Sequence, residues 1–187
     1  MADFQTWFVQ LLVGATGVRT LMHSIWMWPI AETIHFIGLS LLVGSILFFD
    51  FRLLGIGRAI PIRAMHRFIR WGLLGFGLNV VTGSMFLMAE PDQYVYNTAF
   101  QFKVVFIAVA GLNALLFYLT SYREIAARDT FDAPRRARVI AGISICMWLG
   151  VIIAGRLLTF YRPYPCGAEG PGAIATCIPG FKTVTWP

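Results

Sequence analysis

The chain has 187 residues, of which 58% are apolar and only 13% are charged. Its mean hydropathy is +0.70. Soluble domains carry about 25% charged residues, and a chain of this size cannot bury so much apolar surface in one soluble core. The composition therefore excludes a typical soluble enzyme, a disordered chain and a disulfide-dense secreted module. It predicts an integral membrane protein.

The segment 1–28 has the apolar rhythm of an amphipathic helix, with apolar side chains recurring at Phe4, Trp7, Phe8, Leu11, Leu12, Ala15 and Val18. Only 15 residues separate Asp3 from Arg19, whereas a membrane span needs about 20. We therefore expect a helix at about residues 3–20 that lies in the membrane interface. A short fifth span is the alternative.

Four later apolar runs are long enough to cross a bilayer. They are Pro29–Phe49, Trp71–Ala89, Val104–Ser121 and Val139–Tyr161. The predicted fold class is therefore all-α, an integral membrane four-helix bundle over residues 29–161. An outer-side tail follows at residues 162–187.

The arginines predict how the bundle is oriented. The connections at 50–70 and 122–138 each hold five arginines, ten of the 15 basic residues, whereas the 90–103 connection holds Glu90, Asp92 and Lys103. The positive-inside rule places the arginine-rich connections in the cytoplasm and both termini outside. The net charge of +6 thus indicates contact with anionic membrane lipid, and we expect no nucleic-acid partner.

Two cysteines fall in the outer tail. Cys166 and Cys177 lie among proline and glycine residues, and the outer side of the membrane is an oxidising compartment. We expect a disulfide between them. The alternative is two unpaired thiols.

Ionisable side chains within apolar spans are rare in membrane proteins and are usually functional or paired. Glu32, His35 and Arg156 lie inside spans, and Lys103 lies at a span boundary. At about 1.5 Å per residue, His35 lies roughly 9 Å and Arg156 roughly 7 Å from the outer ends of their helices. All four are therefore expected in the outer leaflet. Glu32 is expected either to orient the His35 imidazole or to form an ion pair with Arg156.

This set suits haem b or copper. A haem needs an axial histidine, with histidine or methionine opposite, so His35 would pair with His23, with Met85 or with a ligand from a partner. Arg156 and Lys103 would face the propionates. Copper(I) prefers thioether and imidazole ligands, which the same histidines and methionines supply. Because the chain has only three histidines, it cannot build two bis-histidine haem sites; a packing histidine without cofactor is the remaining alternative.

The second span carries small residues on one face, because Gly72, Gly75, Asn79 and Gly83 recur at helical spacing. Such a face permits either close helix packing or contact with a flat cofactor. Asn79 and Asn113 lie near mid-depth and are expected to hydrogen-bond to each other or to contact a cofactor.

At the cytoplasmic end of the first span, Asp50 and Arg52 are two residues apart. They therefore point to different sides of a helix. Each is expected to pair with a neighbouring element.

Two motifs resemble a known group of proteins. They are W-P-x-x-E-x-x-H at residues 28–35 and D-x-R-L-L-G at residues 50–55. The chain resembles an uncharacterised family of small bacterial membrane proteins, which implies a four-helix bundle in the cytoplasmic (inner) membrane of a bacterium. With the orientation predicted from the arginines, both termini then lie in the periplasm. It is more loosely similar to copper-resistance D-type and cytochrome b-type membrane proteins. Paired helical histidines of the cytochrome b pattern are missing.

Three functions are compatible with these features. The first is a subunit of a redox system that binds one haem b or exchanges electrons between quinone and a periplasmic partner. The second is an accessory subunit without cofactor that supports a larger membrane complex, and the third is a copper-handling protein. The sequence contains no Gly-x-Ser-x-Gly, His-Glu-x-x-His or phosphate-binding motif, which argues against a hydrolase.

Overall fold

Four long helices dominate the computed structural model, which describes residues 2–14, 16–122, 125, 133–165 and 177–178. They are α3 (Met27–Leu53), α5 (Ile69–Ala89), α7 (Thr98–Thr120) and α9 (Arg135–Phe160). All four are long and apolar enough to cross a membrane, where helices satisfy their backbone groups internally. The predicted all-α, multi-pass four-helix bundle is confirmed.

Most ends of these helices reach beyond the apolar runs from which they were predicted. For example, α3 continues to Leu53 and α9 begins at Arg135. Backbone hydrogen bonding continues through the charged residues because they lie at the ends of the spans. Asn97 caps α7, since its side-chain oxygen accepts from Ala99 N at 2.9 Å. Its amide group also donates to the carbonyls of Leu158 and Tyr161 at the end of α9.

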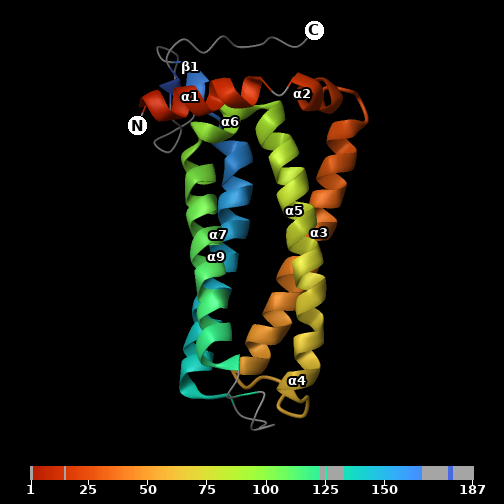
Figure 1. Ribbon diagram of the computed structural model, residues 1–187, viewed down its shortest axis with the longest axis vertical. Helices are drawn as coiled ribbons and strands as arrows, with labels where there is room; N and C mark the ends of the chain where they lie inside the picture. The colour runs from red at the N-terminus through yellow and green to blue at the C-terminus, as the bar shows by residue number, and fades with distance from the viewer. Residues whose placement is uncertain (1, 15, 123–124, 126–132, 166–176, 179–187) are drawn as a thin grey trace.

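The bundle consists of two helix pairs (Figure 1). α3 packs along α5, α7 packs along α9, and α3 also contacts α9. Within the described part of the chain, α5 and α7 are not in extended contact. The two pairs are therefore joined mainly along the side where α3 meets α9.

Glycines bring α3 and α5 into close contact. A Cβ atom added to Gly75 would lie 2.5 Å from the Gly38 carbonyl oxygen and 2.6 Å from Leu42 N. One added to Gly72 would lie 3.3 Å from Ser45 Cβ. The small-residue face of α5 therefore packs closely against α3. Close helix packing was one of the two uses predicted for this face.

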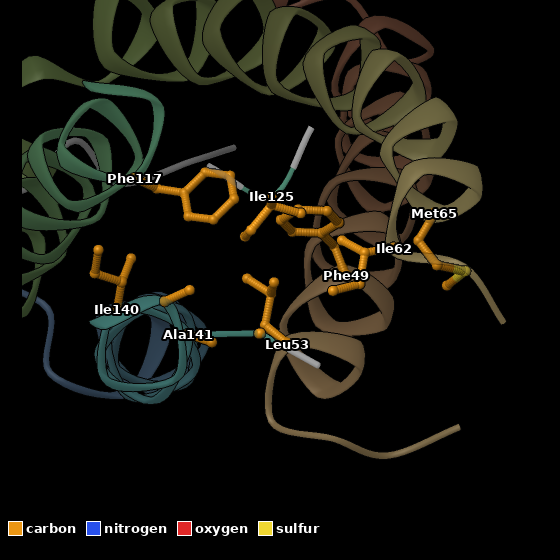
Figure 2. Packing of buried hydrophobic residues seen from close by; sticks show 10 residues of the cluster. Phe49, Leu53, Ile62, Met65, Phe117, Ile125, Ile140 and Ala141 are labelled. Carbon is orange, nitrogen blue, oxygen red and sulfur yellow. The ribbon is translucent and has the colours of Figure 1, made fainter. Parts of the chain in front are cut away.

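At the arginine-rich end, the short helices α4 (Ile62–Met65) and η1 (His66–Phe68) connect α3 to α5. Figure 2 shows the apolar cluster there, whose members are Phe49, Leu53, Ile62, Met65, Phe117, Ile125, Ala133, Ala137, Ile140 and Ala141. Arg52 is buried and donates to the carbonyls of Arg58 and Ile60. Asp50 forms a side-chain hydrogen bond with Ser144 of α9. Both predicted pairings with neighbouring elements are confirmed.

The opposite end is covered by α1 (Ala2–Val13), α2 (Thr16–Met22) and α6 (Pro91–Val95). Figure 1 shows α1 and α2 lying across the ends of the long helices. A single helix over 3–20 was predicted, but α1 ends before Gly14, a residue that weakens a helix interior. α1 has 12 residues, about 18 Å, and is too short to cross a membrane. Its position in the interface stays a prediction.

Within the described residues, the tail forms one short pair of strands. β1 (Tyr164–Pro165) pairs in parallel with β2 (Cys177–Ile178). Cys166 and the side chain of Cys177 lie outside the described residues. The disulfide therefore stays a prediction.

Candidate functional site in the half of the bundle below α1 and α2

His35 on α3 is attached to α5 by a hydrogen bond to Thr82. Its Nδ1 lies 2.7 Å from Thr82 Oγ1, and Thr82 is almost wholly buried. The Thr82 hydroxyl also lies 2.7 Å from the Leu78 carbonyl oxygen, to which it donates. Phe86 packs edge-on against the imidazole, with ring centroids 5.6 Å apart. These contacts fix both the position and the plane of the imidazole ring.

The same contacts determine which His35 nitrogen carries the proton. A threonine hydroxyl has one hydrogen, and two oxygens 2.7 Å apart repel unless that hydrogen lies between them. The Thr82 hydroxyl therefore donates its hydrogen to the Leu78 carbonyl oxygen. Because that hydrogen is engaged, Thr82 Oγ1 accepts from His35 Nδ1–H. In a neutral imidazole the other nitrogen then carries a lone pair. His35 Nε2 is consequently the atom that can bind a metal.

All four long helices contribute residues at about the same depth in the bundle as His35. Lys103 comes from α7 and lies beside Gly155 of α9, where a Cβ atom would be 3.6 Å from Lys103 Nζ. The Lys103 charge is near enough to act on the His35 imidazole. His35, Thr82, Lys103 and Gly155 lie roughly 7–12 Å from the ends of their helices nearest α1 and α2.

The Lys103 ammonium group has no counter-ion among the residues that the structure describes. Within the described residues it forms neither an ion pair nor a hydrogen bond. A cation inside a membrane is costly unless it is paired or faces water. Its place within the span, where its charge also acts on His35, therefore favours an anionic partner that the described residues do not supply.

Two of the predicted site residues lie elsewhere. Glu32 is exposed and interacts with Tyr94 on α6 rather than with His35. Arg156 is exposed and lies over the ring of Phe160 on its own helix, 4.9 Å from the centroid. The expected Glu32–Arg156 ion pair is not formed. The expectation that Glu32 orients His35 is also wrong, because Thr82 occupies that position.

His23 and the methionines lie closer to the end of the bundle. His23 Nε2 is 3.6 Å from Glu90 Oε1, just beyond α5. Met85 packs in one apolar cluster with Met22 and Met27. Phe86 belongs to the same cluster and contacts His35, so it is the neighbour that the methionine cluster and the imidazole share. Among the described residues, no three histidine, cysteine, aspartate or glutamate side chains gather as a metal site.

The two asparagines do not meet. Asn79 donates to the Gly75 carbonyl of its own helix at 2.8 Å and packs against Gly38. Asn113 donates to the Ile140 carbonyl of α9 at 2.9 Å. Each amide therefore serves a different helix pair, and the predicted bond between them is wrong.

The short helix α6 places titratable groups outside the spans. Burial raises the pKa of Tyr94 to about 12; Glu32 and Glu90 add to this effect, while Arg162 opposes it. Burial also raises the pKa of Asp92, against the opposing charge of Arg19. Tyr94 is therefore neutral at physiological pH and can act as a hydrogen-bond donor beside Glu32.

Thr82 is the site residue that the sequence analysis missed. It follows Gly72, Gly75 and Asn79 on the same helical face, at a spacing that would have identified it. Comparisons with protein-family models, curated proteins and solved structures find no match to this chain.

Proposed function

We propose that this protein is a subunit of a membrane redox system and binds one haem b through His35. The observations that carry the proposal are an imidazole held by Thr82 and the charge of Lys103, which acts on that imidazole and has no counter-ion among the described residues. His35 Nδ1 is engaged by Thr82, so Nε2 is the available ligand atom. A haem supplies one-electron transfer and is commonly bound through a histidine imidazole.

The residues around His35 have distinct roles in this proposal. Thr82 sets the tautomer and the ring orientation, as hydrogen-bond partners of ligating histidines do. Lys103 provides positive charge for a haem propionate. Gly83 leaves the edge of the imidazole open, since a Cβ atom there would be 3.8 Å from His35 Cε1. Met85 or a residue of a partner subunit would supply the second ligand to the haem.

The proposal is tested by the visible spectrum of purified protein from cells supplied with a haem precursor. We expect a Soret band equivalent to one haem per chain. His35→Ala should lose the band while it still fractionates with the membrane. His23→Ala and His66→Ala are matched controls and should retain it. Wild-type protein that takes up no haem, or a His35→Ala variant that keeps its haem, would contradict the proposal.

Copper binding is the second candidate, and the grouping of Met22, Met27 and Met85 in one cluster with Phe86, which contacts His35, favours it. Thioether and imidazole ligands suit copper(I). Stoichiometric copper in protein without a Soret band, lost in Met85→Leu, would support this candidate. Protein with neither haem nor copper that co-purifies with other subunits would instead be an accessory subunit.

The proposed location is the bacterial cytoplasmic membrane, with both termini in the periplasm. Its support is the concentration of arginines in the 50–70 and 122–138 connections. In this orientation His35 lies in the periplasmic half of the bilayer. The proposed partners are therefore a periplasmic redox protein or other membrane subunits, with quinone as a partner within the lipid.

A further inference from the structure

A cavity of about 310 Å³ lies between the two helix pairs, toward the arginine-rich end of the bundle. Its lining is mostly apolar and includes the aromatic side chains of Phe49, Phe76, Phe117, Tyr118 and Trp148. Figure 2 shows Phe49 and Phe117 at this end, where their rings meet edge to face at 5.4 Å. The volume is near the lower end of the range of small-molecule sites, about 300–1,000 Å³. It suits one substituted ring.

The cavity faces the lipid between α5 and α7. Leu73 and Phe76 of α5 and Tyr118 of α7 line it, and all three side chains are also exposed on the surface of the bundle. Since α5 and α7 are not in extended contact within the described residues, a ligand can enter laterally. Such a ligand must be soluble in the bilayer.

Two side chains of the lining, Asp50 and Asn113, offer hydrogen-bond acceptors to a ligand. Asp50 is 5% exposed; it bonds with Ser144, and its Oδ2 has no hydrogen-bond partner within the described residues. Asn113 uses its amide nitrogen on the Ile140 carbonyl, which leaves its side-chain oxygen as an acceptor. A buried acceptor without a partner is costly. A ligand that donates a hydrogen bond to Asp50 Oδ2 would satisfy this atom.

We propose that this cavity binds the ring of a lipid-soluble hydroquinone, with a ring hydroxyl donating to Asp50. The aromatic walls favour a flat ring, the lateral opening requires a lipophilic molecule, and the acceptors select the hydroxylated form. Asp50 is 15 residues from His35 on α3, roughly 22 Å along the helix. The role of the hydroquinone as an electron donor rests on the proposed function. Its binding to the cavity does not, because binding requires no cofactor at His35.

The test measures equilibrium binding of duroquinol and of duroquinone, two rings of the same shape of which only duroquinol carries donors. Protein is reconstituted in lipid nanodiscs under anaerobic conditions, and empty nanodiscs correct for partition into lipid. We expect wild-type protein to bind duroquinol at least about 10-fold more tightly than duroquinone, the size of effect that one hydrogen bond contributes. The measurement is repeated on His35→Ala protein, so that failure of this inference is distinguishable from failure of the haem proposal.

Two variants identify the site. Asp50→Asn replaces the unpartnered oxygen with an NH₂ donor while an oxygen remains for Ser144, and should reverse the preference toward duroquinone. A merely destabilised cavity would weaken both ligands together. Gly111→Leu should abolish binding of both ligands. Gly111 lines the cavity and has open space around it, which the leucine side chain would fill. Asp92→Asn, at the other end of the bundle, should behave as wild type. Equal affinity for both rings in wild type, no binding, or an unchanged preference in Asp50→Asn would overturn the inference.

Discussion

Replacing Gly75 with alanine is expected to destabilise the protein by about 1–3 kcal/mol or more, the cost of overpacking a close contact. The added Cβ would lie 2.5 Å from the Gly38 carbonyl oxygen and 2.6 Å from Leu42 N. Both are backbone atoms, so no side-chain rotation relieves the clash and α3 must move away from α5. Thermal unfolding in detergent, followed by circular dichroism, measures the loss.

Gly77→Ala is the matched control for this prediction. It lies two residues away on the same helix, and a Cβ atom there meets nothing within 4 Å. Alanine is the better helix former by about 1 kcal/mol, so this variant should be as stable as wild type or more stable. Equal unfolding temperatures for the Gly75 and Gly77 variants would contradict the close packing of α3 on α5.

The second large effect is expected at Thr82, which we assign as a positioning residue for His35. Thr82→Val keeps the shape of the side chain but removes the oxygen that accepts from His35 Nδ1. Loss of such a partner typically costs about 10–100-fold in ligand affinity. Thr82→Ser retains the hydroxyl and should restore haem affinity to within a few-fold of wild type.

Haem titration of the purified apoprotein measures this difference, with the unfolding temperature of each variant as a control for folding. The valine and serine variants must both be folded for the comparison to be valid. Similar haem affinity in the two variants would contradict the role of Thr82.

The sequence was sufficient for the fold because membrane spans are read from local composition. Four uncharged or nearly uncharged runs determined the helix number, and the glycine face of α5 was visible at Gly72 and Gly75. The partner of that face was not predictable, since any of the other helices could have packed against it. The break near Gly14 was missed because the apolar rhythm continues through it to Val18.

The site was predicted only in part, because local spacing does not reveal which residues meet across helices. His35 and Lys103 were identified as ionisable groups in lipid, and the structure places them at one level. Glu32 was paired with His35 on spacing alone, but it lies one turn nearer the helix end and interacts with Tyr94. Thr82 is uncharged and gave no electrostatic signal.

The protonation state of the His35 ring tests the central claim most directly. Long-range ¹⁵N–¹H NMR of histidine-labelled, cofactor-free protein distinguishes the two neutral tautomers, and His35→Ala assigns the signal. We expect a protonated Nδ1 and an unprotonated Nε2, with Thr82→Val altering this pattern. A His35 ring protonated at Nε2 with Nδ1 bare would contradict the account, because the ligand atom would then face Thr82.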